Sequence, residues 1–151
     1  MYDIRDILNK GIMINEKKKA AYLKLQENSG DIRMRTLVGV FIRELDKEMA
    51  YINRMKENIT DQMAEAIEFS AFDKVSSLVN QFSRTIVPIK IKDRKELLHH
   101  VLEQEKAMYA LLIDIQGRLV TTASPMSVAY YVLLELIEEK SRYIEELKRM
   151  V

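Results

Sequence analysis

The sequence contains no cysteine, and this absence removes several kinds of chemistry at once. Disulfide bonds, thiol catalysis and iron–sulfur clusters all need cysteine side chains, so none of them is available to this chain. Glycine and proline are also scarce, with Gly 4 and Pro 2 among 151 residues. Because sandwiches and barrels of this size need many turn residues, this scarcity favours long helices.

Neither sign of charge predominates. Lys and Arg together number 24, Asp and Glu together number 23, and both kinds are spread along the whole chain. No concentrated basic face of the kind that binds nucleic acid is visible, so no nucleic-acid partner is expected. No apolar run approaches the roughly 20 residues that span a bilayer, and the N-terminus lacks the apolar region of a signal peptide. We therefore expect a cytoplasmic protein without a membrane partner.

Four long segments have the apolar periodicity of helices, at roughly residues 4–27, 32–58, 93–117 and 124–150. A short polar break separates the first two, with Gly30 predicted as a C-cap residue and Asp31 as an N-cap residue. Gly117 or its neighbours are expected to close the third segment. Ser124 is predicted to cap the fourth segment, with Pro125 at its first helical position.

The order of these segments predicts the fold. The chain divides into a helix hairpin, a long connection and a second helix hairpin, at about residues 4–58, 59–92 and 93–150. The connection is expected to hold a short helix from Asp73 to Phe82 and an extended stretch over 86–91. A link as short as the one at Gly30 makes the helices it joins antiparallel neighbours. We therefore predict one all-α domain over residues 1–151, an antiparallel four-helix bundle with one long crossover, as in ferritin-like folds.

Polar side chains interrupt the apolar stripe of every long segment near its middle. These residues are Asn15, Glu48, Glu105 and Lys140. A lone Glu or Lys on such a stripe often lies at its edge and reaches water through its long side chain. Four such residues at one level of a bundle instead favour a central polar cluster. Because burying an unpaired charge costs several kcal/mol, these groups are expected to meet one another or a metal.

Two other polar groups of the sequence are predicted to lie outside this cluster. Lys17, Lys18 and Lys19 form a basic run that we expect on the outer, solvated face of the first helix. His99 and His100 are adjacent, so they point in different directions on a helix. Surface or interface positions are expected for both, and no metal site is predicted from them.

The stripes and their polar interruptions resemble one known family. The segments that carry the resemblance are 11–16 with Tyr22 in the first helix, 37–48 in the second, 101–106 in the third and 132–143 in the fourth. Together they are similar to the rubrerythrin group of the ferritin-like superfamily, specifically its short members without a rubredoxin domain. The resemblance covers nearly the whole chain and implies a ferritin-like bundle.

The same resemblance implies where metal ligands would stand. In that family the first and third helices each supply a glutamate, and the second and fourth each supply Glu-x-x-His. The corresponding residues here are Asn15, Leu45, Glu48, Glu105, Lys140 and Tyr143. A slip of one residue in the second helix would place Glu44 and Lys47 there instead. A di-iron site needs several carboxylates and neutral imidazoles, so most of the ligand set is lost and no metal is expected.

These substitutions suggest a replacement for the metal. We predict that the Lys140 ammonium bridges Glu105 and Glu48, while Asn15 and Tyr143 complete the hydrogen bonds around it. A lysine in that position would place a positive charge where the family holds its metal ions.

Three functions are compatible with these observations. The leading expectation is a metal-free, non-catalytic ferritin-like protein without a cofactor, a structural or interaction module. As in the family, it would form a homodimer, which the apolar residues Val40, Tyr130 and Tyr131 permit. The first alternative is a divergent di-iron or single-metal oxidoreductase that holds iron through Glu48 and Glu105. The second is a protein that binds a small ligand in the centre of the bundle.

Overall fold

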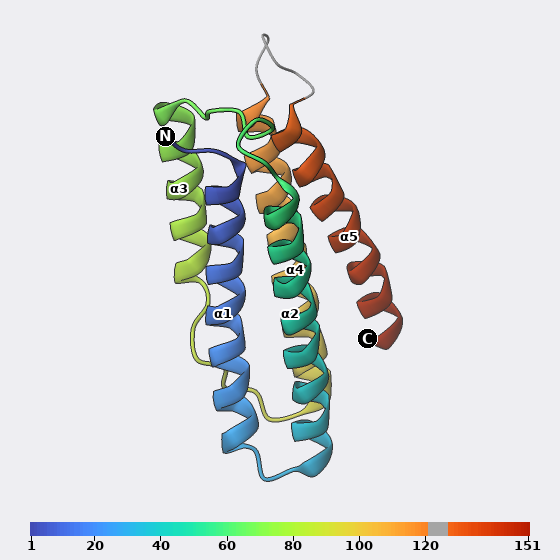
Figure 1. Cartoon of the computed structure of the whole chain (residues 1–151). Helices are drawn as coiled ribbons and strands as arrows, with labels where there is room; N and C mark the ends of the chain where they lie inside the picture. Colours follow the sequence, from blue (N-terminus) through green and yellow to red (C-terminus); the bar gives the residue numbers. More distant parts are fainter. Residues whose placement is uncertain (121–126) are drawn as a thin grey trace.

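The structure is a computed structural model that describes residues 1–120 and 127–151, and over these residues it is all-helical. It contains helices α1 (Ile4–Asn28), α2 (Ile32–Asn58), α3 (Phe69–Arg84), α4 (Arg94–Leu119) and α5 (Val128–Met150), which Figure 1 shows. The four long helices are the four segments predicted from apolar periodicity. The all-α prediction is therefore confirmed.

The link between α1 and α2 follows the predicted break with one change. Asp31 is the N-cap of α2, and its carboxylate accepts a hydrogen bond of 2.9 Å from the Arg33 backbone N–H. The C-cap of α1 is Ser29 rather than the predicted Gly30. No glycine among the described residues has a positive φ, so Gly30 does not form the left-handed cap that glycine usually supplies.

The connection between the two hairpins is more helical than the sequence predicted. Helix α3 extends beyond the expected range 73–82 at both ends, because its apolar face, with Phe72, Val75, Val79 and Phe82, packs into the core. The stretch over 86–91 is irregular backbone and forms no strand. Tertiary packing of this face stabilises a helix whose ends carry no strong sequence signals.

The second hairpin follows the prediction at the end of its first helix. Helix α4 ends at Leu119, two residues after Gly117, as expected for an end at Gly117 or its neighbours. The predicted start of the last helix at Ser124 and Pro125 lies outside the described residues. The described part of α5 begins after Ser127, whose hydroxyl accepts a hydrogen bond of 3.1 Å from the Tyr130 backbone N–H.

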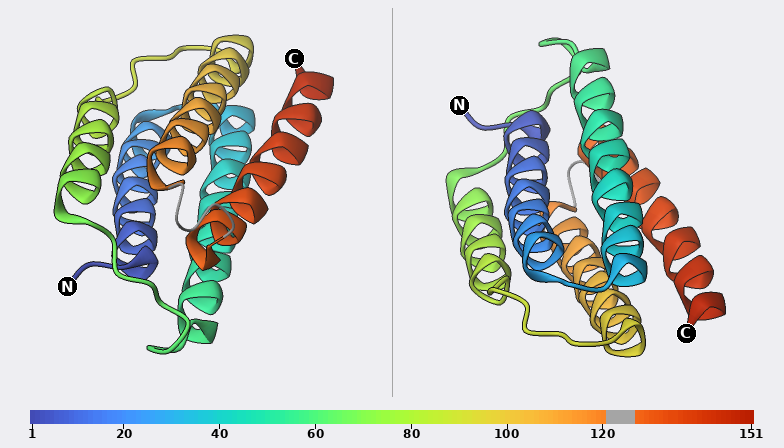
Figure 2. Two further views of the ribbon diagram at one scale, coloured as in Figure 1. Left: turned by 90° about the horizontal axis from the view of Figure 1, so that it is seen from above. Right: turned by 90° about the horizontal axis from the view of Figure 1, so that it is seen from below.

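The helices pack as two pairs with α3 beside them. Helix α1 packs along α2 and α4 packs along α5, while α3 contacts α4 and, to a smaller extent, α1. Figure 2 shows α3 on one side of the molecule and α5 on the opposite side. Helices α2 and α5 belong to different pairs and approach each other less closely than the members of either pair. No helix in the described part of the chain is long and apolar enough to cross a membrane.

The buried side chains divide the core into two apolar clusters. One contains Ile14 of α1, Ile52 of α2 and the later half of α4, together with α3. The other contains Tyr22 of α1 and Leu45 of α2, together with the first turns of α4. Each of the four long helices passes from one cluster to the other near its middle. The predicted polar positions lie at this boundary.

Candidate functional site

A layer of buried polar side chains separates the two apolar clusters. We call it the central polar layer, and it consists of Asn15, Lys18, Glu48, Glu105 and Lys140. Four of these side chains are almost completely buried, and only that of Glu48 retains appreciable exposure, at 21%. Every long helix contributes at least one member, so the layer joins both helix pairs.

Glu105 of α4 is the centre of the layer. Its Oε2 lies 2.6 Å from Lys140 Nζ, and its Oε1 lies 3.3 Å from Lys18 Nζ. Each carboxylate oxygen therefore faces an ammonium group from a different helix. A carboxylate buried to this degree needs such partners, because an isolated charge in the interior would be strongly unfavourable.

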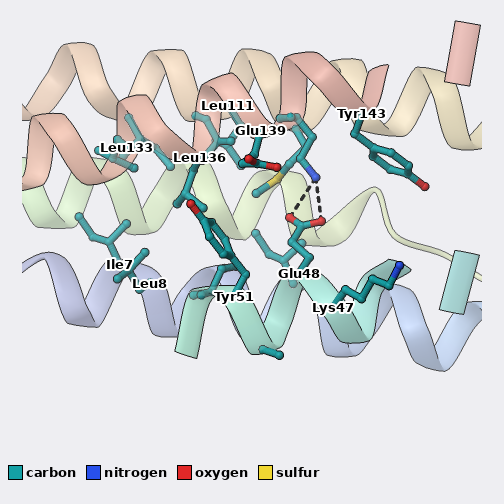
Figure 3. Close-up of a pocket in the computed structure, with 18 of the residues that line it drawn as sticks. Ile7, Leu8, Lys47, Glu48, Tyr51, Leu111, Leu133, Leu136, Glu139 and Tyr143 are labelled. Atoms are coloured by element: carbon teal, nitrogen blue, oxygen red, sulfur yellow. Dashed lines mark hydrogen bonds and ion pairs between the residues drawn. The ribbon is translucent and has the colours of Figure 1, made fainter. Parts of the chain in front are cut away.

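Lys140 of α5 connects Glu105 to a second carboxylate. Its Nζ lies 2.9 and 3.0 Å from the two carboxylate oxygens of Glu48 on α2. In Figure 3, dashed lines mark these two contacts at the Glu48 carboxylate. The predicted bridge of Lys140 between Glu105 and Glu48 is therefore present.

The pKa values of these groups follow from competition between burial and charge. Burial by itself would raise the pKa of Glu105, but Lys140 and Lys18 outweigh it and lower the pKa to about 2. Burial would likewise lower the pKa of Lys140, but Glu105 and Glu48 raise it above the ordinary lysine value. Both residues are therefore charged at neutral pH, and the layer is a network of ion pairs.

Two residues do not take the predicted hydrogen-bonding role. Neither atom of the buried Asn15 amide has a hydrogen-bond partner among the described residues. The ring of Tyr143 lies 5.9 Å from Lys140 Nζ, a cation–π distance, but its hydroxyl makes no hydrogen bond to the described members of the layer. The prediction that Asn15 and Tyr143 complete the hydrogen bonds around Lys140 is therefore wrong.

Lys18 is the member of the layer that sequence reasoning missed. It was expected on a solvated face with Lys17 and Lys19, but it is 1% exposed and pairs with Glu105. Its position explains the difference, since Gly11, Asn15, Lys18, Tyr22 and Leu25 follow one another at alternating spacings of four and three. This spacing places Lys18 on the face of α1 that points into the bundle.

The other two lysines of the run remain at the surface. Lys17 Nζ donates to the Ser83 backbone carbonyl at 2.6 Å, and Lys19 Nζ lies 2.7 Å from an Asp46 carboxylate oxygen. Both contacts are solvent-accessible. The expectation of a solvated basic run therefore holds for these two residues and fails for Lys18 alone.

The histidines lie apart from any metal-ligand group. His99 is exposed, whereas His100 is partly buried and its Nε2 has no hydrogen-bond partner among the described residues. Burial and the nearby charge of Lys18 both lower the pKa of His100. Among the described residues no three His, Cys, Asp or Glu side chains gather closely enough to hold a metal ion.

The residues at which the rubrerythrin resemblance would place metal ligands do not fit a dinuclear metal site. Leu45 is buried in an apolar cluster, and Tyr143 and Asn15 offer at most neutral oxygen donors. Both oxygens of Glu105 and both oxygens of Glu48 already face ammonium groups. A pair of divalent cations needs several anionic ligands, and two carboxylates that already pair with lysine ammonium groups are too few. The donor set therefore suits ion pairing between side chains.

A pocket opens beside the central polar layer. It has a volume of about 430 Å³ and lies between the two helix pairs (Figure 3). Its apolar wall comes from Ile7, Leu8, Ile14, Met108, Leu111, Leu112, Ile115, Leu133 and Leu136, among others. Its polar residues lie on α2 and α5 and include Glu44, Lys47, Glu48, Glu139 and Lys140. The Glu48–Lys140 ion pair is thus also part of the pocket lining.

Comparisons with known proteins do not assign this chain to a family. No family model, no curated protein and no solved structure matches the chain. The resemblance to the rubrerythrin group therefore rests on the sequence pattern, and the function is inferred from the central polar layer and the pocket.

Proposed function

We propose that this protein is a metal-free, non-catalytic bundle of the ferritin-like type that serves as a structural or interaction module. The observation that supports this proposal best is Lys140, whose ammonium lies between Glu105 and Glu48. In a di-iron bundle, metal cations would neutralise the inward-pointing carboxylates. Here Lys18 and Lys140 supply that positive charge from the chain itself.

This arrangement favours a structural role over redox chemistry. A buried ion-pair network that links all four long helices opposes sliding of one helix pair against the other, because any slip would leave a buried charge unpaired. Catalysis by iron needs open coordination positions and ligands that can exchange. Glu48 and Glu105, the two residues that the oxidoreductase alternative requires, are both engaged with lysines.

Metal content tests the proposal. We would purify the full chain without chelators, determine bound metals by elemental mass spectrometry, and repeat the measurement after challenge with ferrous iron and desalting. We expect well below one metal per chain in both samples. One or two irons per chain would overturn the proposal and favour the oxidoreductase alternative.

A matched variant separates specific binding from background. Glu105→Gln removes the carboxylate that any iron at the layer would need, and Glu103→Gln removes an exposed carboxylate from the same helix. Under the proposal, both variants retain the same trace of iron as the unaltered protein. Loss of iron in Glu105→Gln alone would instead locate a metal site at the layer.

The interaction module is proposed to act as a homodimer. Val40 and Tyr131 are exposed apolar side chains, at 40% and 51% exposure, on helices α2 and α5. Sedimentation equilibrium over a range of protein concentrations would measure the mass directly. A mass of one chain at all concentrations would contradict this part of the proposal.

The pocket favours a second candidate function, the binding of a small ligand in the bundle. A pocket of about 430 Å³ lined mostly by apolar side chains, with a few polar groups, is typical of small-molecule sites. This candidate is compatible with a metal-free bundle, because a binding protein needs no catalytic group.

A further inference from the structure

The pocket has the dimensions of a binding site for a slender molecule. Its volume of about 430 Å³ falls within the range of roughly 300–1,000 Å³ that is typical of small-molecule sites. Its lining on α2 extends from Glu44 to Arg54, which is about 15 Å of helix at about 1.5 Å per residue. The pocket is therefore elongated along the bundle.

The two ends of the pocket differ in chemistry. Ile7, Leu8 and Leu133 line it in the part remote from the central polar layer, whereas Glu48 lies at the layer (Figure 3). The wall between them is formed mostly by aliphatic side chains from all four long helices. A complementary ligand would be apolar over most of its length and polar at one end.

The charged residues that line the pocket balance, with Glu44, Glu48 and Glu139 against Lys47, Arg54 and Lys140, so the ion pairing within the central polar layer decides which head group fits. The three most deeply buried charged groups are Lys18, Lys140 and Glu105, which together carry one net positive charge. Glu48 supplies the compensating negative charge, but its side chain is 21% exposed and lines the pocket. Glu48 is therefore the carboxylate of the layer that water can reach if it leaves Lys140, provided that another carboxylate takes its place beside the buried ammonium.

We propose that the pocket binds a medium-chain carboxylic acid, with its unbranched apolar tail along the aliphatic wall and its carboxylate on Lys140 in place of Glu48. This inference rests on the proposed function in one respect, since Lys140 rather than a metal must occupy the end of the pocket. A cationic head would meet the Lys140 ammonium, and an alcohol head would leave a buried positive charge uncompensated if it displaced Glu48.

Three probes with one tail test the head-group preference. Dodecanoic acid, dodecanol and dodecylamine would each be titrated into the full chain by calorimetry, below the concentrations at which they form micelles or separate from water. We expect dodecanoic acid to bind with a dissociation constant at least tenfold lower than either of the others. Equal affinities would show that Lys140 does not discriminate between the head groups, and would overturn the assignment of an acid. If none of the three probes bound, the binding site itself would be overturned.

A filled pocket tests the location. Gly11 lines the pocket, and a Cβ at this position would meet only Ile52 Cδ1, at 3.8 Å. Gly11→Leu therefore extends a side chain into the void while improving helix propensity. Gly117→Leu makes the same change on α4, outside the pocket lining and in open space. We expect at least a tenfold loss of dodecanoic acid affinity in Gly11→Leu and none in Gly117→Leu, and equal affinities would place the ligand elsewhere.

A third variant keeps the test independent of pocket packing. Glu48→Gln removes the carboxylate that would compete for Lys140 and leaves the buried net positive charge without compensation. We expect dodecanoic acid to bind several-fold more tightly to this variant and to raise its melting temperature more than that of the unaltered protein, whereas dodecanol should not. A weaker affinity for the acid would overturn the exchange at Lys140.

The failure of this inference can be told apart from failure of the proposed function. All titrations would use protein treated with chelator and then desalted, with metal content measured on the same sample. Acid binding together with iron uptake on challenge would contradict the metal-free bundle and retain the pocket. Absence of both would retain the metal-free bundle and contradict the pocket.

Discussion

Lys140 Nζ lies 2.6 Å from Glu105 Oε2, and both side chains are almost fully buried between the two helix pairs. The pair links α4 to α5, and Lys18 extends it to α1. Removing one partner of such a pair leaves an uncompensated charge in the interior, which is far more costly than breaking a surface ion pair.

Lys140→Met is therefore expected to destabilise the protein by about 3–5 kcal/mol, because it retains the length and apolar stem of lysine but leaves Glu105 with Lys18 alone. Urea denaturation followed by circular dichroism measures this change. Lys148→Met, which breaks the exposed pair with Glu145, is the control and should cost no more than about 0.5 kcal/mol. Equal losses in the two variants would contradict the buried network.

The three consecutive lysines of α1 should respond very differently to substitution. Lys18→Met removes a buried ammonium from Glu105, whereas Lys17→Met and Lys19→Met remove groups that remain in contact with water. We expect a loss of several kcal/mol in the first variant and changes within about 0.5 kcal/mol in the other two. The same urea experiment ranks them, and a tolerated Lys18→Met would place this side chain outside the layer.

Lowering the pH should destabilise the folded protein, because Glu105 becomes protonated and loses its ion pairs. Its pKa is about 2 in the folded protein, below the ordinary glutamate value, so the unfolded state binds more protons between the two values. The associated stability is fully present above about pH 5 and is lost as the pH falls toward 2. Denaturation curves at several pH values should show a smaller acid dependence for Glu105→Gln than for the unaltered protein, and parallel curves would contradict this assignment.

His100 should titrate below the ordinary histidine range. Burial and the charge of Lys18 lower the pKa of His100, so its contribution to stability is present above the ordinary histidine value and lost below it. A nuclear magnetic resonance titration measures this pKa directly. In Lys18→Met, under conditions where it is folded, the pKa should rise because one positive neighbour is gone; an unchanged value would show that burial alone acts.

Glycine substitutions provide a test of helix packing near the pocket. Gly11→Ala should stabilise the protein by about 0.5–1 kcal/mol, since alanine favours helix and its Cβ would meet Ile52 at an ordinary 3.8 Å. Gly39→Ala should gain less, because its Cβ would lie 3.3 Å from Gln26 Nε2 and the glutamine would have to shift. Thermal denaturation compares the two variants. A destabilised Gly11→Ala would indicate closer packing at Gly11 than the structure describes.

Much of the helical framework could be predicted because its causes are local. Apolar spacing indicated the four long helices, and the side chain of Asp31 caps α2 as its position suggested. The apolar stripes of the helices also identified Glu48, Glu105 and Lys140 as inward-pointing, because a residue three or four positions from its apolar neighbours shares their face. The resemblance to the rubrerythrin group, which puts Lys140 at a metal-ligand position, then suggested the bridge to Glu105 and Glu48.

Other features depended on how the helices meet. Lys18 follows the inward spacing of α1, but a lysine at such a position can also reach water, and only the approach of Glu105 from α4 makes its burial favourable. Among the described residues the Asn15 amide has no hydrogen-bond partner, because hydrogen bonds require atomic distances that sequence spacing does not specify.

The sequence by itself therefore determined the helices, their polar interruptions and the residue types available for ion pairing. The tertiary structure decided which charges meet, and it produced the pocket beside Lys140 because α2 and α5 remain apart where the helix pairs face each other. Local periodicity sets which way a side chain points. The distance between two helices that are remote in sequence is set by the packing of all their side chains together.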